Sequence, residues 1–148
     1  MQNTSRILAI DFGTKVCGFA ISEPLTGNIF PLASFEYKNK DLMQVIKKIK
    51  NIIVDYDGSF PISTLVLGYP LKSGHLKTQT TLFVEQFYQL LLANFASYKI
   101  ELEDESYSSN EAKVILDELE FSPTKYKEKI DQLAAYIILQ RYLSKANV

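Results

Sequence analysis

The sequence predicts an α/β fold in which a five-stranded mixed sheet carries helices on both faces. Short apolar runs bounded by turn residues recur along the chain and are typical of strands. Beyond residue 40, these runs alternate with longer segments whose apolar residues recur at helical spacing. The resulting order, β-β-β-α-β-α-β-α-α, predicts that the first, fourth and fifth strands are parallel.

The N-terminal part of the chain is expected to form three strands in hairpin order and then a helix. Arg6–Ile10 is a short apolar run that stops at Asp-Phe-Gly, and Val16–Ser22 is a second run close behind it. Pro31–Tyr37 follows a turn and predicts a weaker third strand. From Asp41 to Asp55 the apolar residues change to helical spacing, with lysines between them.

Strands and helices alternate in the rest of the chain. Thr64–Leu67 is a short apolar strand, and Ile100–Glu105 alternates apolar and acidic residues as a strand does. Between them, Thr80–Tyr98 carries leucines and phenylalanines at helical spacing. These three segments predict one β-α-β unit.

Two further helices complete the predicted order. Ser108 and Glu111 form a capping-box pattern, which predicts a helix that starts there and ends at about Leu119. Ile130–Ser144 then carries inward apolar residues at helical spacing and forms the last helix.

The composition predicts one globular domain over residues 1–148. A content of 47 % hydrophobic residues supports a sizeable core, and 22 % charged residues are too few for a disordered chain. No apolar run approaches the ~18–20 residues of a membrane span. The N-terminus lacks the pattern of a signal peptide, so we expect a cytoplasmic protein with no membrane partner. The single cysteine, Cys17, excludes an intrachain disulfide and a cysteine-based zinc site.

Three carboxylates are the main candidates for chemistry. Asp11 follows the first strand and Glu105 ends the fifth, so both are expected at the sheet edge where open α/β sheets bind ligands. Asp131 lies near the start of the last helix. The small Ala134 and Ala135 let that helix pack closely on the sheet, with Asp131 over the same edge. Each acid also has a structural interpretation, as a turn residue, a solvated loop residue and a partner of the helix dipole respectively.

Converging carboxylates predict a metal site. They repel one another unless a cation lies between them, and their oxygens suit Mg²⁺ or Mn²⁺. Two such ions about 3.5–4 Å apart activate water and stabilise the leaving oxygen of a phosphodiester. We therefore expect Asp11, Glu105 and Asp131 to be both the ligands of one or two Mg²⁺ or Mn²⁺ ions and the catalytic residues.

Candidate nucleic-acid contacts are basic or small residues near these acids in the sequence. Their alternative role is to form a solvated surface. They are Lys15, Lys72, Ser73, Gly74, Lys77 and Lys129. The formal net charge of −1 gives the chain no overall basic footprint, so we expect weak binding with strong salt sensitivity.

Turn residues accompany the candidate site. Gly13 permits a tight turn after Asp11, and Gly18 permits another part of the backbone to approach the second strand closely. Gly68 and Pro70 stop the fourth strand.

Four segments, in this order and at this spacing, resemble the YqgF/RuvX family over nearly the whole chain. They are Ile10–Lys15, Leu67–Gly74, Asp104-Glu105 with Glu111-Ala112, and Lys129–Asp131 with Ala134-Ala135. The resemblance implies an RNase H-like fold related to the resolvase RuvC. It also implies that Asp11, Glu105 and Asp131 are the metal-binding acids. Two positions depart from the family pattern: Ser106 and Val16 stand where basic residues are usual.

The resemblance implies a metal-dependent endonuclease that processes the 5′ end of pre-16S rRNA in ribosome biogenesis. Its partners would be precursor rRNA and ribosomal particles, and the protein would be a monomer or weak homodimer. An alternative is a Holliday junction resolvase that acts on four-way DNA, and another is a non-catalytic nucleic-acid-binding module. A sugar kinase or actin-like ATPase also shares the first motif, but its nucleotide lies between two such domains.

Overall fold

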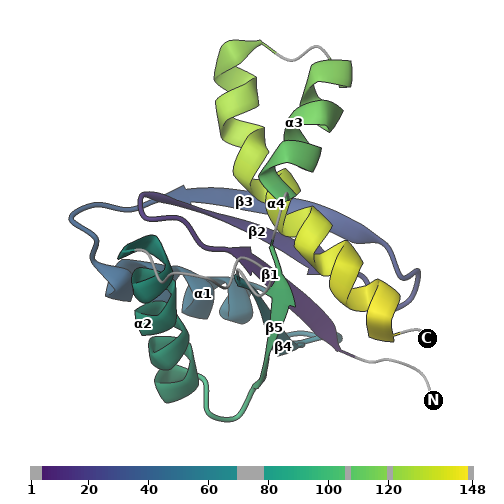
Figure 1. Cartoon of the computed structure of the whole chain (residues 1–148). Coiled ribbons are helices and arrows are strands. Elements are labelled where there is room, and N and C mark those ends of the chain that lie inside the picture. Colours follow the sequence, from purple (N-terminus) through teal and green to yellow (C-terminus); the bar gives the residue numbers. More distant parts are fainter. Residues whose placement is uncertain (1–4, 70–78, 106–107, 120–121, 147–148) are drawn as a thin grey trace.

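The computed structural model describes residues 5–69, 79–105, 108–119 and 122–146, and it confirms the predicted fold class (Figure 1). The sheet has the order β3-β2-β1-β4-β5. β1 pairs antiparallel with β2 and parallel with β4, and β4 pairs parallel with β5. The strands are β1 (Arg6–Asp11), β2 (Val16–Ser22), β3 (Ile29–Glu36), β4 (Ile62–Tyr69) and β5 (Lys99–Asp104).

Helices cover both faces of the sheet. α1 and α2 lie on one face and α4 crosses the other, while α3 and the first turns of α4 form a pair that projects beyond the sheet (Figure 1). The helices are α1 (Leu42–Asp55), α2 (Gln79–Asn94), α3 (Ser108–Leu119) and α4 (Pro123–Ala146). No helix in the described ranges is long and apolar enough to cross a membrane.

The larger core lies between the sheet and the pair α1 and α2. Successive strand residues point to opposite faces, so Leu8 and Ile10 enter this core while Ala9 points the other way. Helix α1 begins at the N-cap Asp41, whose side chain accepts a hydrogen bond from the Met43 N–H, and it buries one apolar face. This core holds the sheet rigidly beneath the candidate acids.

The second core is thin because its sheet residues are small. Ala9, Ala20 and Val66 are fully buried beneath α4, as is Ala135. Ala134 is also fully buried. The predicted close packing of the last helix through small residues is confirmed, and it brings the backbone of α4 near the sheet.

Several predicted boundaries differ from the structure. β3 begins at Ile29, and α2 ends at Asn94 instead of Tyr98. The largest difference is that α4 begins at Pro123, seven residues before the predicted Ile130. Proline suits the first turn of a helix, where its missing N–H costs nothing, and the Ser122 side chain accepts a hydrogen bond from the Lys125 N–H at 3.4 Å.

Candidate active site

Asp11 is the last residue of β1 and faces α4. Ile7 and Ala9, which precede it at alternate positions, belong to the core beneath α4, so the same side of the strand presents Asp11 to that helix. In the antiparallel pairing of β1 with β2, Asp11 lies opposite Gly18. The side chain therefore stands at the carboxyl end of the central strand, on the face that α4 covers.

α4 rests directly on β2 beside Asp11. A Cβ atom at Gly18 would lie 1.9 Å from the backbone oxygen of Asp131, so only glycine allows this approach. The predicted role of Gly18 is confirmed, and it places Asp131 next to the strand pair that carries Asp11. The predicted position of Asp131 near the helix start is wrong, because α4 begins eight residues earlier at Pro123. The helix dipole, which acts within the first turn, therefore does not explain this acid.

Glu105 continues the edge of the sheet immediately after β5. Its N–H donates to the Tyr69 carbonyl oxygen at 3.1 Å, which extends the pairing of β5 with β4. A Cβ atom at Gly68 would lie 3.3 Å from the Glu105 Cβ and 2.5 Å from the Ile138 side chain of α4. Glu105 therefore lies on the α4 face, and Gly68 makes room there for the side chains of Ile138 and Glu105.

The electrostatics couple the three acids. Burial, then the charge of Glu105, then that of Asp131, raises the pKa of Asp11 to about 8. Burial also raises the pKa of Glu105, with a further contribution from Asp104, and burial raises the pKa of Asp131. Asp11 is thus the central group, since it feels both of the other two candidate acids.

The donor set suits a hard cation with an incomplete protein shell. In the ranges that the structure describes, no three His, Cys, Asp or Glu side chains form a ready-made metal site. The acids instead come from separate elements, since β4 lies between β1 and β5 and neighbouring strands lie about 4.8 Å apart. Mg²⁺ fits such a site, since it is held by one or two carboxylates together with waters and substrate phosphates.

The turn after Asp11 is fixed by close backbone packing, a hydrogen bond and an aromatic stack. A Cβ atom at Gly13 would lie 2.3 Å from the Val16 backbone oxygen, so the turn requires glycine, as predicted. The buried Tyr37 donates its hydroxyl proton to the Gly13 carbonyl oxygen at 2.7 Å. Phe12 stacks on Phe87 of α2, with ring centroids 4.3 Å apart. These contacts tie the residues that follow the candidate acid to the larger core.

Cys17 is a core residue. Its side chain is fully buried, and its sulfur lies 3.8 Å from the Gly13 carbonyl oxygen. Burial raises the pKa of the thiol to about 12, so it stays protonated at neutral pH.

A second group of charged residues at this edge went unrecognised in the sequence. The Glu103 side chain is buried and accepts a hydrogen bond from Lys145 Nζ at 2.7 Å. Arg141 donates to the Asp104 carbonyl oxygen at 3.0 Å and to Glu111 Oε1 at 2.7 Å. The sequence did contain a signal for this group. Arg141 and Lys145 are spaced by one helical turn, and their partners Asp104 and Glu103 directly precede Glu105.

The predicted nucleic-acid contacts are only partly brought to this edge. Lys15 is exposed just beyond the turn that follows Asp11. Lys129 lies on α4 two residues before Asp131, and side chains two apart on a helix do not face the same side. The remaining predicted loop residues, and the departure at position 106, lie outside the described residues: Pro70, Lys72, Ser73, Gly74, Lys77 and Ser106.

The predicted helix cap is described only in part. α3 does begin at Ser108, but the side chain of that residue is not described. Glu111 lies in the first turn of α3, where its carboxylate forms an ion pair with Arg141. The start of α3 is therefore confirmed, while the hydrogen bond from the serine side chain stays a prediction.

Comparison with known proteins identifies the family of this chain. A family model described as RuvX, Holliday junction resolvase, matches residues 5–145. The chain belongs to the RuvX family. A relative in Mycoplasmopsis pulmonis, named "Putative pre-16S rRNA nuclease", is 38 % identical over 97 % of this chain and 96 % of its own length. Relatives of the same name in Mycoplasmopsis synoviae and Ureaplasma parvum are 41 % and 39 % identical over 93 % and 95 % of this chain and over 96 % and 97 % of their own lengths.

Solved structures show that this RuvX chain shares the RNase H-like resolvase fold. The fowlpox virus Holliday junction resolvase matches with a TM-score of 0.56 and 15 % identity, over 97 % of this chain and 99 % of its own. RuvC of T. thermophilus, solved in complex with a Holliday junction substrate, matches with a TM-score of 0.51 and 10 % identity, over 95 % and 96 %.

Proposed function

We propose that this RuvX protein is a metal-dependent endonuclease that processes precursor 16S rRNA. The observation that carries the proposal is the placement of Asp11, Glu105 and Asp131 on the α4 face at one end of the sheet. Carboxylates that raise the pKa of a central acid at the end of parallel strands are expected where a cation and a phosphate bind. The name of the relatives, "Putative pre-16S rRNA nuclease", supports precursor 16S rRNA as the substrate.

In this proposal Asp11 is the shared ligand, with Glu105 on one side of it and Asp131 on the other. Bound Mg²⁺ or Mn²⁺ supplies activation of water and stabilisation of the charge that develops on the phosphate. Gly68 lets the Ile138 side chain of α4 pack closely beside Glu105. Lys15, exposed beyond the Asp11 turn, contacts a neighbouring phosphate.

Cleavage of a precursor 16S rRNA transcript by the purified full chain, with Mg²⁺ or Mn²⁺, tests this function. We expect products with 5′-phosphate and 3′-hydroxyl ends. Asp11→Asn is expected to lower the rate by at least about a hundredfold, the scale on which a group that stabilises transition-state charge acts. Asp57→Asn, a charge-matched change at an exposed position, is the control. Full activity of Asp11→Asn would sink the mechanism.

A second candidate substrate is four-way DNA, which the description of the family model favours. Two symmetric cuts need two active sites, so this function predicts a dimer. The same assay with a four-way DNA junction, together with sedimentation of the protein, separates the two. RNA binding without metal-dependent cleavage, unaffected by Asp11→Asn, identifies a non-catalytic binding module instead.

A further inference from the structure

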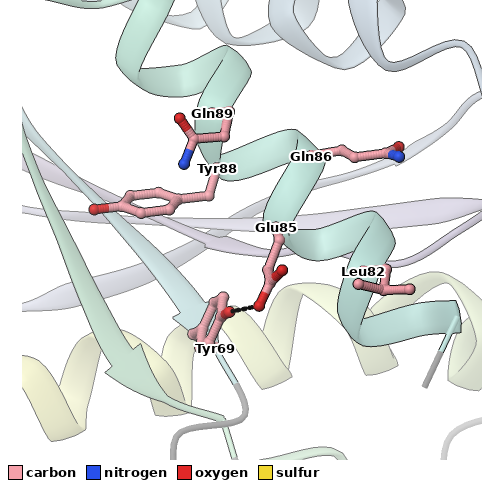
Figure 2. Close-up of a pocket in the computed structure, with 6 residues that line it drawn as sticks. All are labelled: Tyr69, Leu82, Glu85, Gln86, Tyr88 and Gln89. Atoms are coloured by element: carbon pink, nitrogen blue, oxygen red, sulfur yellow. Dashed lines mark hydrogen bonds between the residues drawn. The ribbon is translucent and has the colours of Figure 1, made fainter. Parts of the chain in front are cut away.

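An open groove of about 520 Å³ begins at the carboxyl end of β4 and follows one side of α2 (Figure 2). Figure 2 shows Glu85 pointing from α2 toward Tyr69 at the end of β4, with the Tyr88 ring one turn further along the helix. The described lining residues are Tyr69, Leu82, Glu85, Gln86, Tyr88 and Gln89.

The groove starts at the same end of the sheet as the candidate active site but on the opposite face, because Tyr69 belongs to the core beneath α2 whereas the acids lie under α4. The Tyr69 carbonyl oxygen accepts the hydrogen bond from the Glu105 N–H, and Tyr69 lies opposite Asp104 in the β4–β5 pairing. A polymer whose phosphate is held at the Asp11–Glu105 edge therefore reaches this groove by passing over the carboxyl end of β4. A small molecule would have no such connection between the two places.

The lining suits a flat, polar and uncharged ring. The Tyr69 hydroxyl donates to Glu85 Oε1 at 2.9 Å, which fixes the ring of Tyr69 between β4 and α2. Burial, and then its bond to Glu85, raises the pKa of Tyr69, so its hydroxyl stays a donor. Tyr88 is half-buried and offers a second aromatic ring, while Gln89 on the same side of α2 carries an amide with both donors and acceptors (Figure 2).

The charge of the groove argues against phosphate as its occupant. The only charged residue among the described lining residues is the acidic Glu85. A phosphate would be repelled here, whereas a base is neutral and its amino groups donate to carboxylate and amide oxygens. Phosphate and base are thus expected to separate, with the phosphate at the metal edge and the base against α2.

We propose that this groove binds an unpaired nucleobase of the strand whose phosphate lies at the acidic edge. The inference rests on the proposed nuclease function and adds the substrate class: a single-stranded segment. Proteins hold splayed bases by stacking on aromatic side chains and by hydrogen bonds to the base edges. Unpaired RNA and the unstacked bases of branched DNA offer the same chemistry, and the test separates them.

Binding of short labelled strands to the full chain in EDTA, where no cleavage occurs, tests the groove. Tyr88→Ala is expected to weaken the binding of single strands about tenfold, the effect of one lost stacking contact. Tyr88→Phe keeps the ring and is expected to bind like the wild type. Asn51→Ala, an exposed polar change on α1, is the matched control. Gln89→Ala, at an exposed position that leaves the core intact, is expected to weaken binding by a smaller factor.

An abasic scan gives the readout that a merely structural role would not move. Removing one base at a single position is expected to weaken wild-type binding about tenfold, again the scale of one stacked base, and to leave Tyr88→Ala unchanged. Equal losses in both proteins at every position, equal affinity of the wild type and Tyr88→Ala, or no binding of any single strand overturns the proposal. RNA and DNA strands run in parallel show which source of the unpaired base is preferred.

These experiments test the proposed nuclease function and the proposed base-binding groove independently. Metal-dependent cleavage that needs Asp11 but not Tyr88 supports the function and removes the groove. Binding that depends on the base and on Tyr88, in a protein that cleaves no substrate, supports the groove and contradicts the nuclease function.

Discussion

At the scale of single residues, a charged Asp11 carboxylate lowers the stability of the folded protein. Burial and two neighbouring acids raise its pKa to about 8, so its charged form is unfavourable in the folded protein. The surroundings nonetheless hold it in place, through the Tyr37 bond to the Gly13 carbonyl and the Phe12 stack on Phe87. Residues kept in such environments are characteristic of functional sites.

This cost predicts a pH dependence of stability. The folded protein keeps the Asp11 proton up to about pH 8, whereas the unfolded chain releases it near pH 4. The free energy of unfolding of the wild type should therefore fall as the pH rises from about 4 to about 8 in metal-free buffer. Asn cannot ionise, so Asp11→Asn should be the more stable protein at pH 8. One pKa unit alone is worth about 1.4 kcal/mol, and each kcal/mol raises Tm by roughly 2–4 °C in a chain of this size.

Thermal unfolding in EDTA at several pH values measures this effect. The wild type and the control Asp57→Asn should lose stability together as the pH rises, and Asp11→Asn should lose less. Equal pH slopes for wild type and Asp11→Asn would contradict the environment described for this carboxyl. Mg²⁺ at pH 8 should stabilise the wild type and not Asp11→Asn, since only the wild type offers the central ligand.

At the scale of elements, α4 both covers the sheet and completes the candidate site. Its small and apolar residues bury Ala9, Ala20 and Val66. Asp131, about one third of the way along α4, lies against Gly18 of β2. Further along, Lys145 reaches the buried Glu103 of β5. One helix thus links the strand beside Asp11 to the strand that leads to Glu105, so the distance between the acids depends on how closely α4 packs.

Gly18→Ala is the sharpest test of that packing. The added Cβ would collide with the Asp131 backbone, so α4 must move outward, and we expect a loss of about 1–3 kcal/mol or more of unfolding free energy. Urea unfolding measures it. Gly58→Ala is the matched control, because an added Cβ there meets nothing within 4 Å, and it should be neutral or slightly stabilising. A loss no larger than that of Gly58→Ala would contradict the close approach of α4.

At the scale of the whole molecule, the net charge of −1 conceals an uneven arrangement. The acids Asp11, Glu105 and Asp131 gather on one face of one sheet edge, while exposed lysines are scattered elsewhere. In the described ranges, Lys15 is the predicted nucleic-acid contact that lies exposed at this edge. In the proposed function the described residues would thus neutralise few phosphates, and the proposed cation and base groove would supply much of the affinity.

This arrangement of the described residues replaces the strong salt sensitivity expected from the sequence with a shallow salt dependence. The slope of log K against log salt for single-stranded RNA should be about −2 to −3, the value for three or four phosphate contacts. Lys15→Gln should make the slope less steep by about 0.7, the effect of one lost contact. Fluorescence anisotropy across a range of KCl concentrations measures both. A slope steeper than about −6 would show an extended basic surface that the described residues do not form.

Much of this molecule was predictable, because its local patterns and its tertiary contacts agree. The strands and helices follow from apolar period and turn residues, and parallel pairing then places Asp11 and Glu105 at one edge. Gly18 was predictable as a point of close approach, since a glycine inside an apolar strand gives up side-chain packing that only a nearby backbone or a bulge requires. The start of α4 was not predictable, because its first turns project beyond the sheet and lack a strong apolar period.

The sequence by itself therefore determined the fold class and the family resemblance, and it predicted the three candidate acids. Only the tertiary structure decided which partner each acid has. Burial and the crossing of α4 set the charges around Asp11, and these depend on distances between residues far apart along the chain. The same holds for the Glu103–Lys145 pair and for the groove between Tyr69 and Tyr88. Local propensity acts over a few residues, whereas electrostatic coupling and a binding surface arise from contacts that only the folded chain makes.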